Sequence, residues 1–155
     1  MLYAVVLFLH SWLRWGVVVL GVLTLGASLS GWLRGRDWTR SDRRLQLSFV
    51  SAFDLQLLLG MTLYFALSPL TPRSMDALRT SMSVTVLRFF SLEHPVMMLL
   101  ALVAAHVASA LSRRADDSGR KHRVWAVGLL VALLFIALGI PWPWLSHGRP
   151  LLRGF

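Results

Sequence analysis

The hydrophobic positions of this chain form four long runs that are separated by short polar segments. The runs lie at about 3–30, 45–67, 85–112 and 123–140. Each is long enough to cross a bilayer as a helix, because about 17–25 apolar residues span the hydrocarbon core. The sequence therefore predicts an all-α, polytopic membrane protein. We expect one domain over 1–155, folded as a four-helix, up-down-up-down transmembrane bundle.

Proline residues mark the ends of two of these runs. Ser68, Pro69 and Pro72 follow the second run, and Pro-Trp-Pro-Trp at 141–144 follows the fourth. Proline lacks the backbone N–H that a helix interior needs, so both helices should end there. Between the second and third runs, the segment from about 72 to 82 is expected to form a short interfacial helix.

The composition supports a membrane protein and excludes several other classes. Of 155 residues, 56% are hydrophobic and 15% are charged, and the mean hydropathy is +0.63. The sequence has no cysteine, which excludes disulfides, thiolate metal sites, iron–sulfur clusters and a cysteine nucleophile. It also lacks a phosphate-binding loop, a hydrolase motif and zinc-site spacing. A metal or cofactor would have to be held by histidine, methionine or oxygen ligands.

The net charge of +9 comes mostly from two connections between the runs. Loops rich in Lys and Arg stay in the cytoplasm, so both termini should face outward from a bacterial inner membrane. The placement of Lys and Arg in cytoplasmic loops of a membrane protein accounts for the positive net charge, so we expect no nucleic acid as a partner. The first and third connections carry Arg34, Arg36, Arg40, Arg43, Arg44, Arg113, Arg114, Arg120, Lys121 and Arg123, against Arg73, Arg79, Arg149 and Arg153 in the second connection and the tail.

Ionisable residues inside the runs are the best candidates for function, because a charge at membrane depth costs roughly 2.5–3.5 kcal/mol. His10 and Arg14 are four residues apart and share one face of the first helix. Glu93 and His94 precede Pro95, which should kink the third helix. With a rise of about 1.5 Å per residue, these four side chains fall within roughly 10 Å of the midplane, in one outward layer.

Two histidines at one depth on two helices are the arrangement that holds haem iron from both faces in membrane b-type cytochromes. We therefore expect His10 and His94 to be the axial metal ligands of haem b. Arg88 would receive the propionates, and Arg14 would tune the site electrostatically. In the alternative interpretation, both histidines are ordinary buried polar groups that neighbouring side chains or carbonyls satisfy.

The other ionisable residues have plainer structural interpretations. An ion pair between Arg14 and Glu93, with Asp54 as a second acceptor, would hold the bundle together. His106 lacks a histidine partner at its depth, so we expect it to bond toward Asp54. Two histidines outside the runs are expected to be solvated: His122 and His147.

Glycine and alanine residues on the first and third helices predict that these two helices pack closely. Small side chains four residues apart allow two helix backbones to approach each other. We expect Met97 and Met98 to fill the core. The small residues are Gly16, Gly21 and Gly26 on the first helix and Ala101, Ala104, Ala105 and Ala108 on the third.

Four sequence motifs are distinctive: Leu-His-Ser-Trp-Leu-Arg-Trp at 9–15, Leu-Gln-Leu-Leu-Leu-Gly at 55–60 with Leu-Tyr-Phe at 63–65, Arg-Phe-Phe-Ser-Leu-Glu-His-Pro at 88–95, and Ile-Pro-Trp-Pro at 140–143. Together they resemble a family of small bacterial four-helix membrane proteins that are loosely labelled cytochrome b-like. The resemblance covers nearly the whole chain and implies a four-helix inner-membrane protein. Some members have histidine where this chain has Asp54. If that histidine is an obligatory ligand in them, its replacement counts against haem binding here.

The leading functional hypothesis is electron transfer by a haem protein, either with quinone or within a larger respiratory or photosynthetic complex. The alternative is a cofactor-free accessory subunit that docks to other membrane subunits or to further copies of itself. A third interpretation, quinone or proton handling through Glu93 and Asp54, is weaker because these carboxylates form no chain across the membrane. A haem spectrum of the purified protein would distinguish the first hypothesis from the second.

Overall fold

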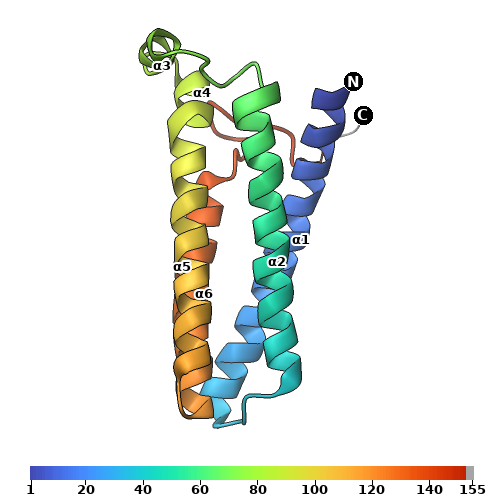
Figure 1. Cartoon of the computed structure of the whole chain (residues 1–155), viewed down its shortest axis with the longest axis vertical. Coiled ribbons are helices and arrows are strands. Elements are labelled where there is room, and N and C mark those ends of the chain that lie inside the picture. The colour runs from blue at the N-terminus through green and yellow to red at the C-terminus, as the bar shows by residue number, and fades with distance from the viewer. Residues whose placement is uncertain (153–155) are drawn as a thin grey trace.

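The computed structural model describes residues 1–152, which form helices joined by short loops. Four long helical segments run in alternating directions along the longest axis of the molecule (Figure 1). The predicted all-α, up-down-up-down bundle is therefore confirmed. The elements are α1 (Leu2–Arg34), α2 (Arg40–Thr62), the π-helical turn η1 (Leu63–Leu67), α3 (Met75–Ser81), α4 (Thr85–Arg88), the π-helical turn η2 (Phe89–Glu93), α5 (His94–Arg114) and α6 (Ser118–Gly139).

The four long segments have the length and composition of membrane-spanning helices. They cover Leu2–Arg34, Arg40–Leu67, Thr85–Arg114 and Ser118–Gly139 and correspond to the four predicted runs. Their outer faces carry many exposed leucine and valine side chains. So large an exposed apolar surface is unusual for a soluble monomer and fits a lipid environment.

Capping residues decide where two of the helices begin. Thr39 and Asp42 form a capping box, so α2 begins before its hydrophobic run does. Asp117 accepts a hydrogen bond from the backbone N–H of Arg120 at 2.7 Å, which starts α6 in the same way. Hydropathy alone placed both boundaries several residues too late, because the first turn of each helix is polar.

The closest helix pair is α5 with α6, and α1 packs against α2 and α6. Ala101, Ala105 and Ala108 of α5 are buried, and a Cβ atom at Gly128 of α6 would collide with Ala108. The predicted close approach of the first and third helices is therefore wrong. The alanine face of α5 meets α6 instead, because Gly128 on α6 provides the matching small residue.

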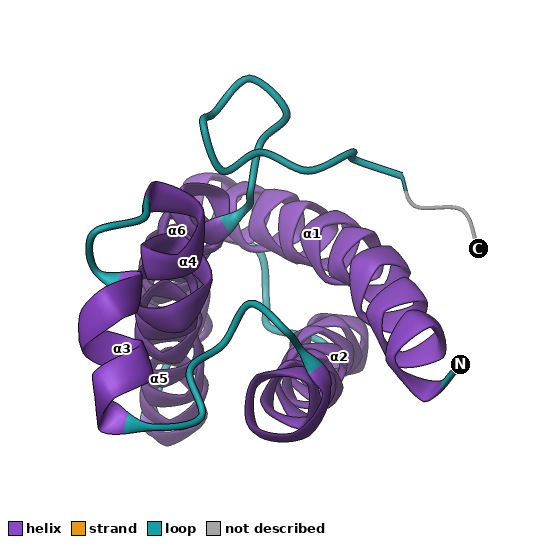
Figure 2. Ribbon diagram, turned by 90° about the horizontal axis from the view of Figure 1, so that it is seen from above, coloured by secondary structure: helices purple, strands orange, loops and turns teal. Residues whose placement is uncertain are grey.

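The best-packed part of the core lies toward the end of the bundle that carries the α1–α2 and α5–α6 loops. Phe49, Phe53 and Trp125 are fully buried there, and the rings of Phe49 and Trp125 meet edge to face with centroids 6.1 Å apart. Toward the opposite end the helices diverge (Figure 1). There the segment after α6 leaves the bundle and runs along the outer side of α1 (Figure 2). This end holds the candidate site.

The helix distortion predicted at Pro95 takes the form of the π-helical turn η2, which ends immediately before His94. Because Pro95 has no N–H, the carbonyl of Ser91 loses its usual helical donor. The hydroxyl of Tyr64 donates to that carbonyl at 2.9 Å instead. Turns of this kind are rare and occur frequently at functional sites. The predicted interfacial helix near residues 72–82 is present as α3.

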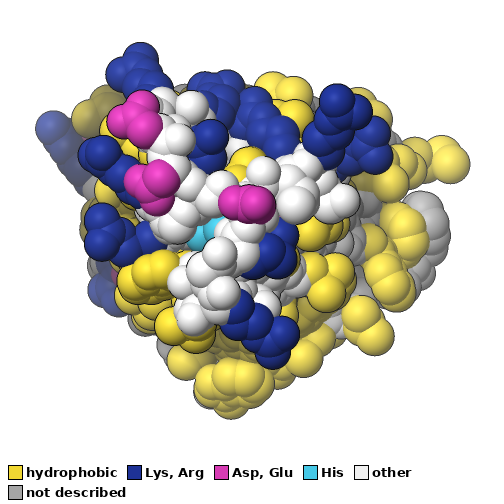
Figure 3. Space-filling model, turned by 90° about the horizontal axis from the view of Figure 1, so that it is seen from below, with side chains coloured by type: hydrophobic (Ala, Val, Ile, Leu, Met, Phe, Trp, Pro, Cys, Tyr) yellow, Lys and Arg dark blue, Asp and Glu magenta, His cyan; other side chains and the backbone are white. Residues whose placement is uncertain are grey.

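The two basic loops lie at one end of the bundle, and the two chain ends approach the other (Figure 1). Seen from the loop end, Lys and Arg side chains are spread over much of the surface (Figure 3). The fold thus separates the charges as the sequence pattern predicts. Which side of a membrane each end faces stays a prediction.

Candidate cofactor cavity

A cavity of about 610 Å³ lies among the four long helical segments at the end of the bundle opposite the basic loops, and the segment that follows α6 also lines it. Small-molecule and cofactor sites commonly measure about 300–1,000 Å³. Apolar side chains make up most of its surface. The described residues that contribute polar side chains to the lining are Tyr3, His10, Ser11, Arg14, Gln56, Tyr64, Ser68, Thr71, His94 and Arg149.

His10 lines this cavity from α1 and is held closely against α2. The side-chain amide of Gln56 donates to the backbone carbonyl of His10 at 2.9 Å. A Cβ atom at Gly60 would lie only 3.2 Å from Cε1 of His10, so the ring packs directly on the backbone of α2. The Nδ1 atom of His10 is buried and has no hydrogen-bond partner among the described residues. An ordinary buried histidine would have that nitrogen satisfied.

His94 lines the cavity from the first residue of α5. Its Nδ1 atom lies 2.7 Å from the carbonyl oxygen of Gly139, at the end of α6. Since a carbonyl only accepts hydrogen bonds, the neutral imidazole carries its hydrogen on Nδ1 and keeps a lone pair on Nε2. Hydrogen bonds to backbone carbonyls orient metal-binding histidines in this way.

The two imidazole rings, which the sequence predicts to share one layer, are neighbours in the structure. Their centroids are 6.3 Å apart, and their planes are inclined by 70°. An imidazole nitrogen binds a transition metal at about 2 Å, and the ring centre lies roughly 1 Å beyond it, so two axial imidazoles have centres about 6 Å apart. The distance between the rings of His10 and His94 is therefore close to that expected of two imidazoles that bind one ion.

Two arginines bring positive charge to the cavity. Arg14 donates to the carbonyl of Leu151 at 2.8 Å. The guanidinium of Arg149 lies over the ring of Phe90, 5.5 Å from its centroid. Within the described residues, no carboxylate lines the cavity. This charge distribution favours a ligand with anionic groups.

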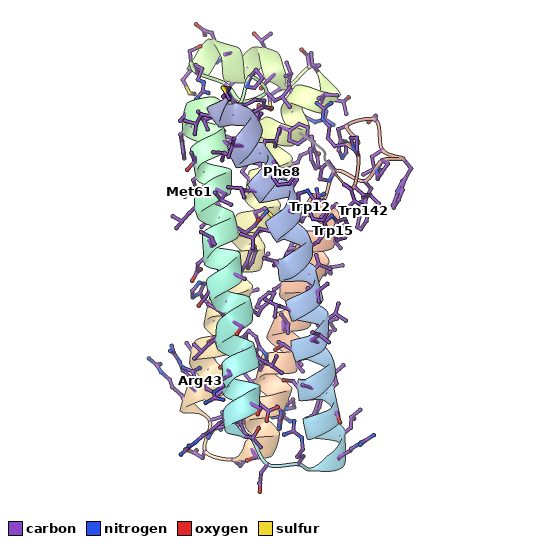
Figure 4. All side chains as sticks on the ribbon, turned by 90° about the vertical axis from the view of Figure 1, so that its right-hand side faces the viewer. Phe8, Trp12, Trp15, Arg43, Met61 and Trp142 are labelled. Carbon is purple, nitrogen blue, oxygen red and sulfur yellow. The ribbon has the colours of Figure 1, made fainter. Side chains whose placement is uncertain are left out.

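Aromatic residues fasten the C-terminal segment that carries Arg149 to α1. The indole N–H of Trp15 donates to the same Leu151 carbonyl at 2.9 Å, and its ring lies 6.5 Å from that of Trp142. Figure 4 shows Trp15 and Trp142 close together beside the upper part of α1. Because this segment returns to α1, Arg149 reaches the cavity although it lies far along the chain from the other polar residues of the lining.

Arg88, the predicted partner of the propionates, does not line the cavity. Its Nε atom donates to Oε1 of Glu93 at 2.7 Å, and both side chains are partly exposed. The predicted ion pair between Arg14 and Glu93 is therefore replaced by a local one on the same helical segment. The sequence does not predict Arg149 as a cation of the cavity, because nothing in the local pattern indicates that the tail returns to α1.

The predicted contact between His106 and Asp54 is confirmed. Nε2 of His106 lies 2.8 Å from Oδ1 of Asp54, and the two side chains are 48% and 46% exposed. Asp54 therefore pairs across α2 and α5 and does not join Arg14. This pair is remote from the cavity and belongs to the outer surface of the bundle, well inside two candidate spans.

The prediction that His122 and His147 are solvated is wrong for His122 and holds only in part for His147, which is partly buried. His122 is fully buried, its ring lies 4.8 Å from that of Trp38, and neither of its ring nitrogens has a hydrogen-bond partner among the described residues. His147 stacks on Phe89 with centroids 3.7 Å apart. Both rings pack against residues that are distant in the sequence, and loop composition does not reveal such contacts.

Comparison with known proteins gives no assignment. No protein-family model, no curated protein and no solved structure matches the chain. The resemblance to cytochrome b-like proteins stays a prediction, and a functional proposal rests on the geometry of the cavity itself.

Proposed function

We propose that this protein is a b-type haem protein of the bacterial inner membrane that takes part in electron transfer, with His10 and His94 as axial ligands. The observation that carries the proposal is the 6.3 Å separation of the two imidazole rings inside one cofactor-sized cavity. When bound, haem would supply one-electron exchange at its iron.

The surrounding residues have definite roles in this proposal. The carbonyl of Gly139 orients His94 and keeps the Nε2 lone pair free, as ligation requires. Contacts with Gln56 and Gly60 hold His10 in place. These contacts fix both rings before a ligand binds, which lowers the entropy cost of forming the site.

The two cavity arginines suit the carboxylates of a haem group. Arg14 and Arg149 both line the cavity, and no carboxylate among the described residues competes for them there. The Nε atom of Arg14 is buried without a hydrogen-bond partner in the described structure, so it has a donor to spare. We therefore assign the propionates to Arg14 and Arg149, and Arg88 loses that role.

The redox partner would be quinone or a neighbouring subunit of a respiratory or photosynthetic complex. The cavity lies near the end of the bundle where both chain ends lie. With the basic loops in the cytoplasm, this end faces outward. Electrons would therefore exchange near the outer surface of the membrane.

The decisive test is an absorption spectrum of protein purified from a haem-replete host. We expect a Soret band that sharpens and shifts on reduction, as low-spin bis-histidine haem does. His10→Ala and His94→Ala should each abolish the band or convert it to a weaker, five-coordinate form.

His106→Ala is the matched control, because His106 is also a histidine inside a candidate span but pairs with Asp54 away from the cavity. Its spectrum should equal that of the unmodified protein. A colourless but well-folded preparation would refute the haem proposal. A band that only His106→Ala removes would show that the ligands had been assigned to the wrong histidine.

The second candidate function, an accessory subunit of a membrane complex, is favoured by the Asp54–His106 pair. Both side chains are about half exposed on the outer surface, within segments long and apolar enough to cross a membrane. Polar groups that face lipid at this depth are costly, so they usually face other helices. We infer that a helix of another subunit or of a second copy covers this pair.

Site-specific photocrosslinking in cells tests this second candidate. Val103 lies one turn from His106 on α5, and Leu134 lies on α6; both are 57% exposed. A photoreactive residue at 103 should give a defined protein adduct that Asp54→Asn reduces, whereas one at 134 should not. Equal crosslinking at the two positions, or none at 103, would contradict a partner at the Asp54–His106 surface.

A further inference from the structure

A second, smaller cavity lies at the opposite end of the bundle, between the start of α2 and the α5–α6 junction. Its volume is about 180 Å³, which is large enough to hold a small ligand group. It is remote from the histidine cavity, and the proposed haem function makes no use of it. Its lining residues are Trp38, Arg43, Gln46, Ser112, Arg113 and Lys121.

The lining is strongly basic. Arg43, Arg113 and Lys121 contribute three cations, and no described residue of the lining is acidic. The carboxylate of Asp42 lies next along the chain but is bound to Arg36 at 2.7 Å and to Thr39 at 2.6 Å. Three like charges around one small cavity repel each other unless an anion lies between them.

Gln46 adds a buried hydrogen-bond donor with no partner. The residue is fully buried, and its Oε1 atom accepts a hydrogen bond from Arg43 at 2.6 Å. That bond directs the amide nitrogen away from the arginine, and Nε2 has no partner within the described structure. A buried amide N–H without an acceptor costs about 1–3 kcal/mol. A ligand with acceptor oxygens would remove this cost.

The walls of the cavity are held in place by other contacts. The hydroxyl of Ser112 donates to the carbonyl of Lys121 at 3.1 Å, which joins α5 to α6. Trp38 packs against the buried ring of His122. Figure 4 shows Arg43 at the lower end of α2, on the side of the bundle rather than at its tip. Of the proposed donors, Arg43 and Gln46 are held by their mutual hydrogen bond before any ligand binds.

We propose that this cavity is a binding site for a phosphate-bearing anion, with Arg43, Arg113, Lys121 and the Gln46 amide as its donors. The chemistry is that of a phosphate group, which accepts hydrogen bonds from several cationic and neutral donors at once. A phospholipid headgroup and free inorganic phosphate both provide it. The position at the basic end of the spans is where anionic headgroups gather, since basic pockets between membrane helices bind them.

The test measures binding of two probes to the full-length protein in neutral detergent. Native mass spectrometry with added phosphatidylglycerol, and with phosphatidylcholine for comparison, measures headgroup binding. Titration calorimetry with inorganic phosphate measures binding of the free ion. The double variant Arg43→Gln/Arg113→Gln should weaken phosphatidylglycerol binding by about tenfold or more, given the electrostatic contribution of each basic residue.

The matched control is Arg44→Gln/Arg114→Gln, which removes the same net charge from exposed neighbours outside the cavity lining. It should leave binding within about twofold, because surface charges are largely screened by salt. Phosphatidylglycerol binding that only the cavity variant weakens supports a lipid headgroup site, and inorganic phosphate binding with the same dependence supports a site for the free ion.

A third variant tests the buried donor. Gln46→Leu keeps the approximate size of the side chain and removes the unpartnered N–H, so it should weaken the same probe severalfold. Circular dichroism and thermal unfolding check that the variants remain folded. Equal losses in the cavity and control variants, or no binding of either probe to the unmodified protein, would overturn the proposal.

Discussion

At the scale of single residues, the site depends on glycines, whose lack of a side chain lets neighbouring groups approach the backbone. Gly60 lets the ring of His10 rest on the backbone of α2. Gly139 offers its carbonyl to His94 while leaving room for Met98, which a Cβ atom at 139 would strike. In both places a glycine allows close approach: the ring of His10 occupies the space at Gly60, and the side chain of Met98 occupies it at Gly139. The same principle places the buried ring of His122 over Gly31.

The substitution Gly60→Ala tests this dependence. Replacing glycine by alanine inside a helix normally stabilises it by up to about 1 kcal/mol. At Gly60 the new methyl group would lie 3.2 Å from Cε1 of His10, and overpacking of this kind costs about 1–3 kcal/mol. We expect a lower Tm than that of Gly26→Ala, the matched control, where a Cβ atom meets nothing within 4 Å.

Thermal unfolding in detergent, followed by circular dichroism, provides the measurement for both glycine variants. If Gly60→Ala proved as stable as Gly26→Ala, the tight packing of His10 on α2 would be disproved. Should the protein carry haem, Gly60→Ala should also broaden its Soret band, and Gly26→Ala should leave it unchanged.

At the scale of elements, the two π-helical turns adjust the geometry of the helices around the cavity. In η2, Pro95 removes the donor of the Ser91 carbonyl, and the Tyr64 hydroxyl of η1 replaces it at 2.9 Å. The hydrogen bond from Tyr64 to Ser91 thus joins η1 to η2. Arg73 adds hydrogen bonds to the carbonyls of Tyr64 and Phe65 at the end of η1. These side-chain donors satisfy carbonyls that an uninterrupted α-helix would pair internally.

A double-mutant cycle tests the link between the two turns. Tyr64→Phe should destabilise the protein by about 1–3 kcal/mol, because it leaves a buried carbonyl without a donor. Pro95→Ala restores an N–H that can bond the same carbonyl within a regular helix. The double variant should therefore lose less stability than the sum of the two single losses, as measured by thermal or denaturant unfolding. Strict additivity would mean that the Tyr64 hydroxyl and Pro95 act independently.

At the scale of the whole molecule, the bundle has two chemically different ends. The histidine cavity lies near the chain ends, and the basic cavity lies near the two Arg-rich loops. Both polar sites are lined by several helices, whereas the well-packed aromatic and aliphatic core lies between the loops and the histidines. Such a division keeps each polar site near one surface of a membrane.

Cysteine accessibility tests the orientation of these ends. The sequence contains no cysteine, so single cysteines can be introduced without background. Asp37→Cys and Ser118→Cys, at the basic end, should resist a membrane-impermeant thiol reagent in intact cells. Asp76→Cys, at the α3 end, should react. Labelling at position 37 or 118 from outside would reverse the proposed topology.

The sequence predicted the main architecture because membrane insertion follows local composition. Each apolar run had to become a helix, since lipid offers no hydrogen-bond partner to an open backbone. The contact between His106 and Asp54 was also predictable, because few other polar side chains lie on the inward side of the spans. Helix starts were less accurate, since Thr39 and Asp117 cap their helices at polar residues that hydropathy does not count.

What the sequence alone determined is the number, order and alternating direction of the helices, and the layer shared by His10 and His94. Both follow from hydrophobic length and helical rise, which are local quantities. Only the tertiary structure decided that α5 packs on α6, that Arg149 rather than Arg88 lines the cavity, and that His122 is buried. These outcomes depend on which helix faces meet and on where the tail folds, and such contacts join residues too distant in the chain for any local pattern to record.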